Sequence, residues 1–189
     1  MRPDVAALIL AGGKASRMGG VDKRELVVEG RTIFERQLEA LAGFDILVSS
    51  PRDISGHRTV RDAISNGGPL AGIAAGLVAT CTPWLLVLAG DMPYITSAVI
   101  GRLVSRTADD IDAVGIRLAG RPEPLVCVLR VSVFLPLVQA RLERGDLKAS
   151  RLLTDAGLRV HWLPEAELRA VDPSLASLAN INEPHDLNR

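Results

Sequence analysis

The chain begins with a short apolar segment that runs directly into a glycine-rich loop. Val5–Leu10 consists of six apolar residues in succession, as is typical of a central parallel strand covered on both faces. The residues that follow, Ala11 to Lys23, read A-G-G-K-A-S-R-M-G-G-V-D-K. Glycines permit positive φ and let the backbone approach a ligand closely. A strand that leads into such a loop is typical of a phosphate-binding site in α/β proteins.

This loop differs from two well-known phosphate-binding fingerprints. It contains neither G-x-x-x-x-G-K-[ST] nor G-x-G-x-x-G, so the P-loop and dinucleotide-fold motifs both fail. Arg17 and Lys23 nevertheless place two cations where a triphosphate would lie. We expect the loop to bind a nucleotide through these cations and through Leu10, Ala11, Gly12 and Gly13.

Composition narrows the class of protein. The 189 residues are 48% hydrophobic, which suits one domain with a sizeable core. The 22 basic and 22 acidic residues cancel, which argues against a general nucleic-acid binder. No apolar run approaches roughly 18 residues, and the N-terminus has no signal-peptide layout. We expect a cytoplasmic protein without a membrane span, whose Cys81 and Cys127 are free thiols.

Apolar runs alternate with helical patterns along the chain. The expected strands are Val5–Leu10, Ile46–Val48, Thr59–Arg61, Trp84–Ala89, Ala113–Leu118, Leu125–Leu129 and Arg159–Leu163. The expected helices are Thr32–Leu41, Leu70–Ala79, Thr96–Leu103, Val131–Arg144 and Lys148–Ala156. This alternation predicts a single Rossmann-like three-layer α/β/α domain over residues 1–189, with a mostly parallel sheet. Ligands of such sheets bind at the carboxyl ends of the strands.

Asp91 stands at one of these strand ends. It follows the apolar run Trp84–Ala89, and the next residues, Met92 and Pro93, stop the strand. Mg²⁺ usually takes one or two carboxylates together with substrate phosphates. Gly-Asp-x-Pro is also ordinary turn chemistry, but the glycine-rich loop at the other strand end favours a metal-binding role for Asp91.

A second glycine-rich segment, Gly67–Gly72, opens a helix, and Pro69 suits its first turn. Its glycines could serve close packing against the sheet. Alternatively, backbone groups of Gly68, Pro69 and Leu70 could form a wall of the base and ribose pocket.

Taken in order, these segments resemble those of the molybdenum cofactor guanylyltransferases, in the MobA-like nucleotidyltransferase family. The resemblance is carried by L-A-G-G at Leu10, G-P-L-A-G at Gly68, G-D-M-P at Gly90, R-P-E-P-L at Arg121 and N-I-N-E-P at Asn180. The chain departs from the family at Ser49 and Ser50, where the family often has an asparagine, and at Arg24 and Glu25 after Lys23.

The resemblance implies transfer of GMP from GTP to the terminal phosphate of molybdenum-bound molybdopterin, with release of pyrophosphate. It implies that Asp91 binds Mg²⁺, that Lys23 contacts the nucleotide phosphates, and that Asp62 contacts the nucleotide, while the role of Arg17 follows from its charge in the loop. It favours GTP over CTP through L-A-G-G and G-P-L-A-G. Cofactor-insertion proteins and molybdoenzyme chaperones are the protein partners that such a product implies.

For the binding of the acceptor, the resemblance points to Arg121, Pro124, Asn180 and Asn182. Two asparagines at i and i+2 on an extended segment face the same way, so they could bind a pterin or a phosphate, or lock the C-terminal segment onto the domain. The prolines around Arg121 equally describe a connection between strands.

Two other functions remain open from the sequence. One is a sibling enzyme, a cytidylyltransferase or a transferase that makes sugar nucleotides. The other is a non-catalytic nucleotide-binding protein that delivers the cofactor; Asp91 and Lys23 argue against it, because a pure binder has no need of a metal-holding carboxylate.

Overall fold

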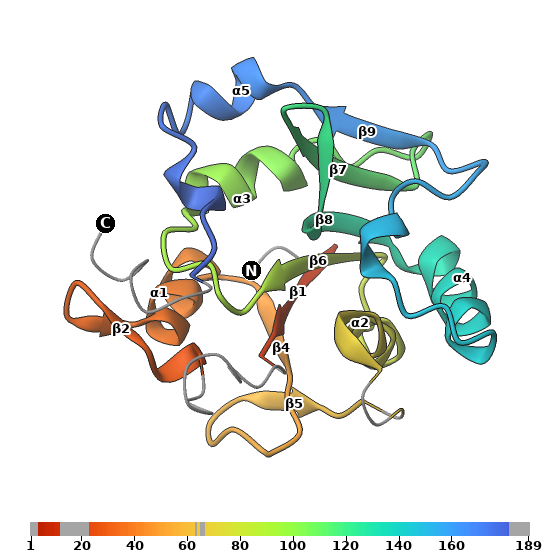
Figure 1. The fold of residues 1–189 in the computed structure, drawn as a ribbon, viewed down its shortest axis with the longest axis horizontal. Helices are drawn as coiled ribbons and strands as arrows, with labels where there is room; N and C mark the ends of the chain where they lie inside the picture. Colours follow the sequence, from red (N-terminus) through yellow and green to blue (C-terminus); the bar gives the residue numbers. More distant parts are fainter. Residues whose placement is uncertain (1–3, 12–22, 63, 65–66, 182–189) are drawn as a thin grey trace.

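A seven-stranded sheet forms the centre of the molecule (Figure 1). The structure is a computed structural model that describes residues 4–11, 23–62, 64 and 67–181. The strands of the sheet are β1 (Val5–Leu10), β4 (Asp45–Ser49), β5 (Arg58–Val60), β6 (Trp84–Ala89), β7 (Ala113–Leu118), β8 (Arg121–Arg130) and β9 (Val160–Leu163). Two further short strands, β2 (Val27–Val28) and β3 (Arg31–Thr32), pair as a separate hairpin.

The strand order is β5-β4-β1-β6-β8-β7-β9. β5, β4, β1 and β6 pair in parallel, and β7 pairs in parallel with β9. β8 is antiparallel to both of its neighbours, β6 and β7. The predicted mostly parallel sheet is therefore confirmed, with β8 reversed within it.

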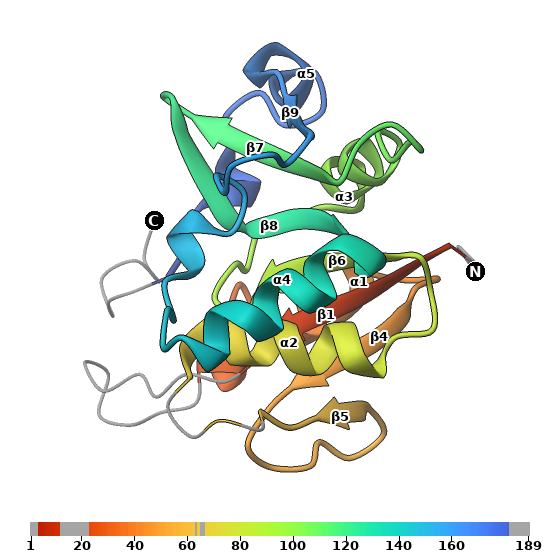
Figure 2. The same cartoon turned by 90° about the vertical axis from the view of Figure 1, so that its right-hand side faces the viewer.

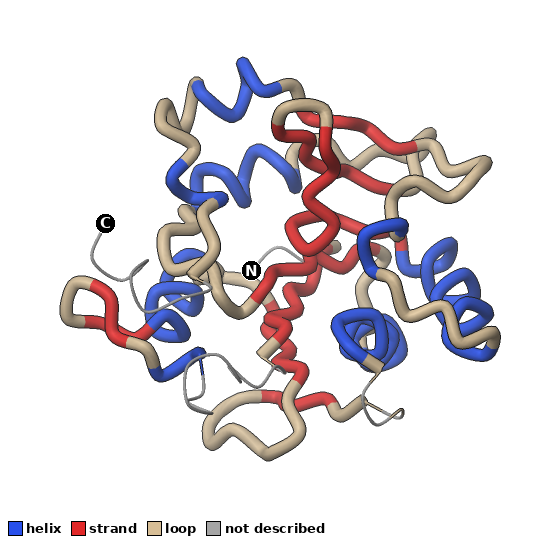
Figure 3. Tube along the Cα trace, in the orientation of Figure 1, coloured by secondary structure: helices blue, strands red, loops and turns tan. Residues whose placement is uncertain are grey.

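Helices cover both faces of the sheet, as Figures 1 and 3 show. α1 (Ile33–Ala40), α3 (Ser97–Val104) and α5 (Glu165–Arg169) lie on one face. α2 (Gly68–Ala79) and α4 (Val131–Glu143) lie side by side on the other, in front of the sheet in Figure 2. The short 3-10 turns are η2 (Lys23–Glu25), η3 (Ala149–Arg151) and η4 (Ala176–Leu178). This arrangement confirms the three-layer α/β/α architecture.

The sequence of β1 explains why it is covered on both faces. Val5, Ala7 and Ile9 belong to the core beneath α1 and α3. Their neighbours Ala6, Leu8 and Leu10 belong to the core beneath α2 and α4, because successive side chains of a strand point to opposite faces. An unbroken apolar run is therefore required at the centre of this sheet.

Close packing of α2 on the sheet depends on its glycines. A Cβ on Gly76 would lie 2.6 Å from Cδ2 of Leu8, and a Cβ on Gly72 would lie 2.6 Å from Oγ of Ser49. One of the two functions expected for the glycines in this region, close packing, is therefore confirmed for α2.

Most of the expected elements are present within a few residues of their predicted bounds, but the residues around Arg121 differ. They were expected to connect two strands, whereas β8 already begins at Arg121. The connection is only Ala119 and Gly120, which have φ of 48° and 79°. Two residues of positive φ form a tight turn that suits the twist of a hairpin. Because the turn is so short, β8 begins earlier than expected.

The expected helix Lys148–Ala156 is wrong. Only a 3-10 turn, η3, forms there. The Lys148 carbonyl oxygen accepts a hydrogen bond from the buried Arg141 guanidinium at 2.6 Å, and the Lys148 N–H donates to Oδ1 of Asp146 at 3.3 Å. These tertiary and local bonds hold the segment in a turn. The β2–β3 hairpin and α5 were not expected.

No helix among the residues that the structure describes is long and apolar enough to span a membrane.

Candidate active site

The carboxyl ends of β1, β4 and β6 meet at one edge of the sheet. Leu10 is in register with Ser49 on one side and with Ala89 on the other. Beyond the strands, the Ala11 N–H donates to the Ser49 carbonyl at 2.9 Å, and the Gly90 N–H donates to the Leu10 carbonyl at 3.1 Å. The chain therefore leaves β1 toward the predicted phosphate loop directly beside the turn that carries Asp91.

Gly90 allows this close approach of β1 and β6. A Cβ at Gly90 would lie 2.5 Å from the carbonyl oxygen of Leu10, which is backbone and cannot move aside as a side chain can. The next residue, Asp91, is half-buried at this edge. The position of Asp91 thus follows from a contact that only glycine permits.

Asp62, which the family resemblance points to, hydrogen-bonds Ser49, one of the positions at which the chain departs from the family. The Ser49 hydroxyl donates to Oδ1 of Asp62 at 3.1 Å. Burial of the carboxyl raises the pKa of Asp62 above its ordinary value, and the hydrogen bond from Ser49 opposes that shift. Because Ser49 is the last residue of β4, Asp62 lies at the same sheet edge as Ala11.

The start of α2 presents backbone rather than side chains. Gly68 has φ of +62°, and Gly67, the N-cap residue, offers no side-chain cap to the first N–H groups of the helix. Gly68 and Pro69 are exposed, whereas the Leu70 side chain is fully buried in the core beneath α2. A ligand at this helix end would therefore meet Leu70 only through its backbone.

Asn180 is brought to the turn that carries Asp91. The N–H of the adjacent Ile181 donates to the Asp91 carbonyl oxygen at 2.9 Å. The Ile181 side chain is buried against Val28 and Ile33, while Asn180 is exposed. The predicted acceptor segment and the predicted metal ligand are therefore adjacent in space, although about half of the chain separates them in sequence.

Pro124 and Arg121 lie at different distances from this edge. The β6–β8 register ends at Leu88↔Val126, two residues from Pro124. The β7–β8 register shifts just there, so that Ile116 pairs with Glu123. Arg121 instead pairs with Leu118 beside the hairpin turn and is exposed. Pro124 thus lies in an irregular part of β8 near the end of β6, and Arg121 lies farther out on the hairpin.

Glu123 was not singled out from the sequence. It is half-buried at the irregularity of β8, and burial raises the pKa of its carboxyl. In the sequence, Glu123 is a carboxylate between two prolines, a pattern that by itself indicates only a turn.

Several expected site residues lie outside the described residues, namely Gly12, Gly13, Arg17 and Asn182. Lys23 begins η2, and only its backbone is described.

The chemistry at this edge fits a magnesium ion that is shared with a substrate. Within the described ranges, no group of three or more His, Cys, Asp or Glu side chains is arranged to hold a metal ion. Mg²⁺ dehydrates reluctantly and is usually bound through one or two carboxylates and substrate phosphates. Asp91 is half-buried beside Ala11, where the predicted phosphate loop begins, and its carboxylate is the type of donor that such a site requires.

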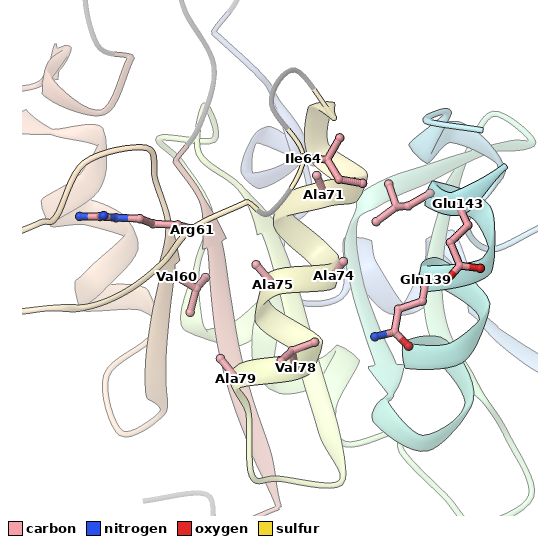
Figure 4. Close-up of a pocket in the computed structure, with 11 residues that line it drawn as sticks. Val60, Arg61, Ile64, Ala71, Ala74, Ala75, Val78, Ala79, Gln139 and Glu143 are labelled. Carbon is pink, nitrogen blue, oxygen red and sulfur yellow. The ribbon is translucent and has the colours of Figure 1, made fainter. Parts of the chain in front are cut away.

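A separate cavity of about 630 Å³ lies between α2 and α4 (Figure 4). One wall consists of the small apolar side chains of α2, and Gln139 and Glu143 of α4 form the other. Neither Asp91 nor Asp62 lines this cavity, although Arg61, the residue before Asp62, does.

Comparisons with known proteins agree with this geometry. Residues 7–160 match the family described as MobA-like NTP transferase domain. The molybdenum cofactor guanylyltransferase of Desulfosudis oleivorans is 31% identical over 98% of this chain and 93% of its own. The probable molybdenum cofactor guanylyltransferase of Methanosarcina mazei is 35% identical over 96% of this chain and 88% of its own.

Solved structures give the same result. Molybdopterin-guanine dinucleotide biosynthesis protein A from Archaeoglobus fulgidus superimposes with a TM-score of 0.81 at 27% identity, over 98% of this chain and 95% of that one. The 2-C-methyl-D-erythritol 4-phosphate cytidylyltransferase of Thermus thermophilus shares the fold, with a TM-score of 0.70 at 19% identity over 98% of this chain and 96% of that one. Given the match over residues 7–160 and relatives that align along nearly its whole length, the chain belongs to the MobA-like NTP transferase family and is a nucleotidyltransferase.

Proposed function

We propose that this protein transfers GMP from GTP to the terminal phosphate of molybdenum-bound molybdopterin and releases pyrophosphate. The observation that carries the proposal is the contact between the Asp91 turn and the Asn180–Ile181 segment, because it joins a nucleotide side and an acceptor side at one sheet edge. The names of the relatives, molybdenum cofactor guanylyltransferases, support this choice of substrates.

In the proposed reaction, a phosphate oxygen of the acceptor attacks the α-phosphorus of GTP. A new bond forms between that oxygen and the α-phosphorus, and the bond to the β-phosphate oxygen breaks, so pyrophosphate leaves with the electron pair. Such a displacement needs positioning and charge stabilisation rather than a protein nucleophile. Lys23 and Arg17 would stabilise the charge on the α-phosphate and on the leaving pyrophosphate.

Asp91 would hold Mg²⁺ against the phosphates. When bound, the ion neutralises developing negative charge on the phosphate oxygens. Asp62, with its hydrogen bond from Ser49, would contact the nucleotide beside the exposed backbone of Gly68 and Pro69. Asn180, Asn182, Pro124 and Arg121 would contact the acceptor, with Arg121 reaching in from the hairpin.

We place this reaction in the cytoplasm, in accord with the expectation from the sequence. Its product would pass to cofactor-insertion proteins or molybdoenzyme chaperones, which are the partners that the proposed product implies.

The deciding experiment measures pyrophosphate release with GTP, CTP, ATP and UTP, each with Mg²⁺ and a molybdopterin-containing acceptor. Release confined to GTP and dependent on the acceptor is expected. Release with CTP would identify a cytidylyltransferase. Tight GTP binding without release would identify a nucleotide-binding delivery protein.

A pair of variants tests the metal site within this assay. Asp91→Ala should lower turnover by about 10²–10³-fold, as for other preorganised electrostatic groups. Asp109→Ala is the matched control, because that carboxylate is fully exposed on the connection between α3 and β7. Near-normal turnover of Asp91→Ala at saturating Mg²⁺ and GTP would show that Asp91 is not the metal ligand.

A further inference from the structure

A buried glutamine of α1 is bonded to the turn that carries Asp91. The side chain of Gln37 is completely buried. Its Nε2 donates to the carbonyl oxygen of Ala89 at 2.8 Å and to that of Met92 at 3.3 Å. These two carbonyls precede and follow Asp91, so one side chain from another element holds both ends of the turn.

The two carbonyl partners also fix the orientation of the amide. A carbonyl can only accept, so the nitrogen of the Gln37 amide must face them. Its oxygen, Oε1, is then left buried and has no hydrogen-bond partner in the described part of the chain. A buried acceptor without a partner costs stability. Gln37 is therefore not arranged for stability alone, and the turn that it holds is the feature that explains it.

The start of α1 is bound to the segment that follows Lys23. The Ile33 N–H donates to the Leu26 carbonyl at 2.9 Å, and Nε of Arg36 donates to the Val28 carbonyl at 3.0 Å. α1 thus connects the segment after the predicted phosphate loop to the Asp91 turn, and Gln37 makes the bonds to that turn.

We propose that Gln37 is a positioning residue that holds the Asp91 carboxylate in the orientation that binds Mg²⁺ with the nucleotide. This inference rests on the proposed function for the identity of the metal and the nucleotide. Outer residues that orient a metal ligand commonly change metal affinity by about 10- to 100-fold when they are removed.

The test compares Gln37→Met with the unaltered protein. Methionine has a similar length and no donor, so it leaves the two carbonyls without a partner. The probe is a non-hydrolysable GTP analogue, with binding measured in the presence of Mg²⁺ and in the presence of a chelator. We expect the Mg²⁺-dependent part of the affinity to fall by about tenfold or more, with binding in chelator changed less than twofold.

The matched control lies at the opposite end of the same strands. The Thr82 hydroxyl accepts from the Ala6 N–H at 3.0 Å and donates to the Trp84 carbonyl at 2.7 Å. Thr82→Val removes the hydroxyl that bridges β1 and β6, so it should lower the melting temperature without changing the Mg²⁺ dependence.

Unchanged Mg²⁺-dependent affinity in Gln37→Met would overturn the inference, as would an equal loss in Thr82→Val. If Gln37→Met does not fold, Gln37→Asn provides the same comparison, because it keeps an amide that is one methylene too short to reach both carbonyls. Nucleotide binding that Mg²⁺ does not strengthen in the unaltered protein would also overturn the inference. The transfer assay with acceptor tests the proposed function separately.

Discussion

The backbone N–H of Ile181 donates to the carbonyl oxygen of Asp91 at 2.9 Å. This bond joins the segment before the predicted acceptor residue Asn182 to the turn of the predicted metal ligand. The Ile181 side chain, 2% exposed, packs against Val28 and Ile33 and thereby anchors the segment. In the proposed function, acceptor binding and metal binding would therefore depend on the same contact.

Ile181→Ala should loosen this anchor. Truncation of a buried isoleucine side chain costs about 2–5 kcal/mol of stability where the site cannot collapse. Here it should mainly weaken the attachment of the segment around Asn180 and Ile181. We expect kcat/KM for the acceptor to fall by on the order of 10²-fold, because misplacement of a substrate-positioning segment has effects of that size. Steady-state kinetics with varied acceptor measures it. Ile181→Val, which keeps most of the side chain, should retain nearly full activity, and equal losses in both variants would contradict the anchoring role.

Gly90→Ala adds only one methyl group, yet it should strongly disturb the sheet edge that carries Asp91. The new Cβ would lie 2.5 Å from the Leu10 carbonyl oxygen, so β1 and the Asp91 turn must separate. Overpacking of this kind costs about 1–3 kcal/mol, and we expect Mg²⁺-dependent activity to fall with it. Gly76→Ala is the comparison, since its Cβ would meet the end of the Leu8 side chain. That variant should lose stability in thermal unfolding yet keep its Mg²⁺ dependence; the reverse ranking of activities would refute the argument.

Local patterns were sufficient to predict the centre of the fold. The apolar runs of β1 and β6 have the predicted bounds, because a strand that is covered on both faces must be apolar throughout. The helix expected from Thr96 to Leu103 is present as α3, and Thr96 caps it: the Thr96 hydroxyl accepts from the Val99 N–H at 3.3 Å. The strand ends that carry Ala11 and Asp91 were therefore predictable as neighbours at one edge of the sheet.

Contacts between distant parts of the chain were not predictable. In the sequence, Gln37 stands among the charged residues of its helix as an ordinary polar residue, and its hydrogen-bond partners are 52 and 55 residues away. Ile181 reads as one apolar residue in a polar segment, and its burial depends on the unexpected β2–β3 hairpin. Pro122 and Pro124 indicated a connection, since proline cannot donate to a ladder, yet both lie in β8 at its irregular end.

The hydrogen bond between Ser49 and Asp62 predicts a pH effect. Burial raises the pKa of Asp62 and the Ser49 hydroxyl opposes the rise, so Ser49→Ala should raise that pKa further. If ionised Asp62 contacts the nucleotide, the acidic limb of GTP binding should move to higher pH in Ser49→Ala. Binding titrations across the acidic range measure this shift. Ser50→Ala is the control, because the Ser50 hydroxyl accepts from the Arg52 N–H instead. An identical acidic limb in all three proteins would show that Asp62 does not govern binding.

The carboxyl of Asp62 affects stability in the opposite sense from the carboxyls whose pKa is lowered in the folded protein, such as that of Asp112. Because the pKa of Asp62 is raised in the folded state, its contribution is fully present at low pH and is lost as the pH rises through the folded pKa. Ser49→Ala should therefore enlarge the loss of unfolding free energy between acidic and neutral pH, which denaturant titrations at a series of pH values would detect.

Asp112 should contribute stability with the opposite pH dependence from that of Asp62. Its buried carboxylate accepts hydrogen bonds from the Arg159 N–H at 2.9 Å, from Nε at 3.2 Å and from Nη2 at 2.7 Å, which join the start of β7 to β9. The side-chain and backbone bonds from Arg159 lower the pKa of Asp112. A lowered folded-state pKa gives stability that is present above the unfolded value of about 3.9 and is lost as the pH falls through the folded value.

Asp112→Asn should therefore be less stable than the unaltered protein near neutral pH, and the difference should shrink as the solution is acidified below about pH 4. The Arg159 side chain is 59% exposed, so water screens part of the attraction and limits the effect. Denaturant unfolding at neutral and acidic pH measures both differences, with Asp109→Asn as an exposed control that should follow the unaltered protein. A difference that stays constant across this range would mean that the shape of the Asp112 side chain, and not its charge, holds β9 against β7.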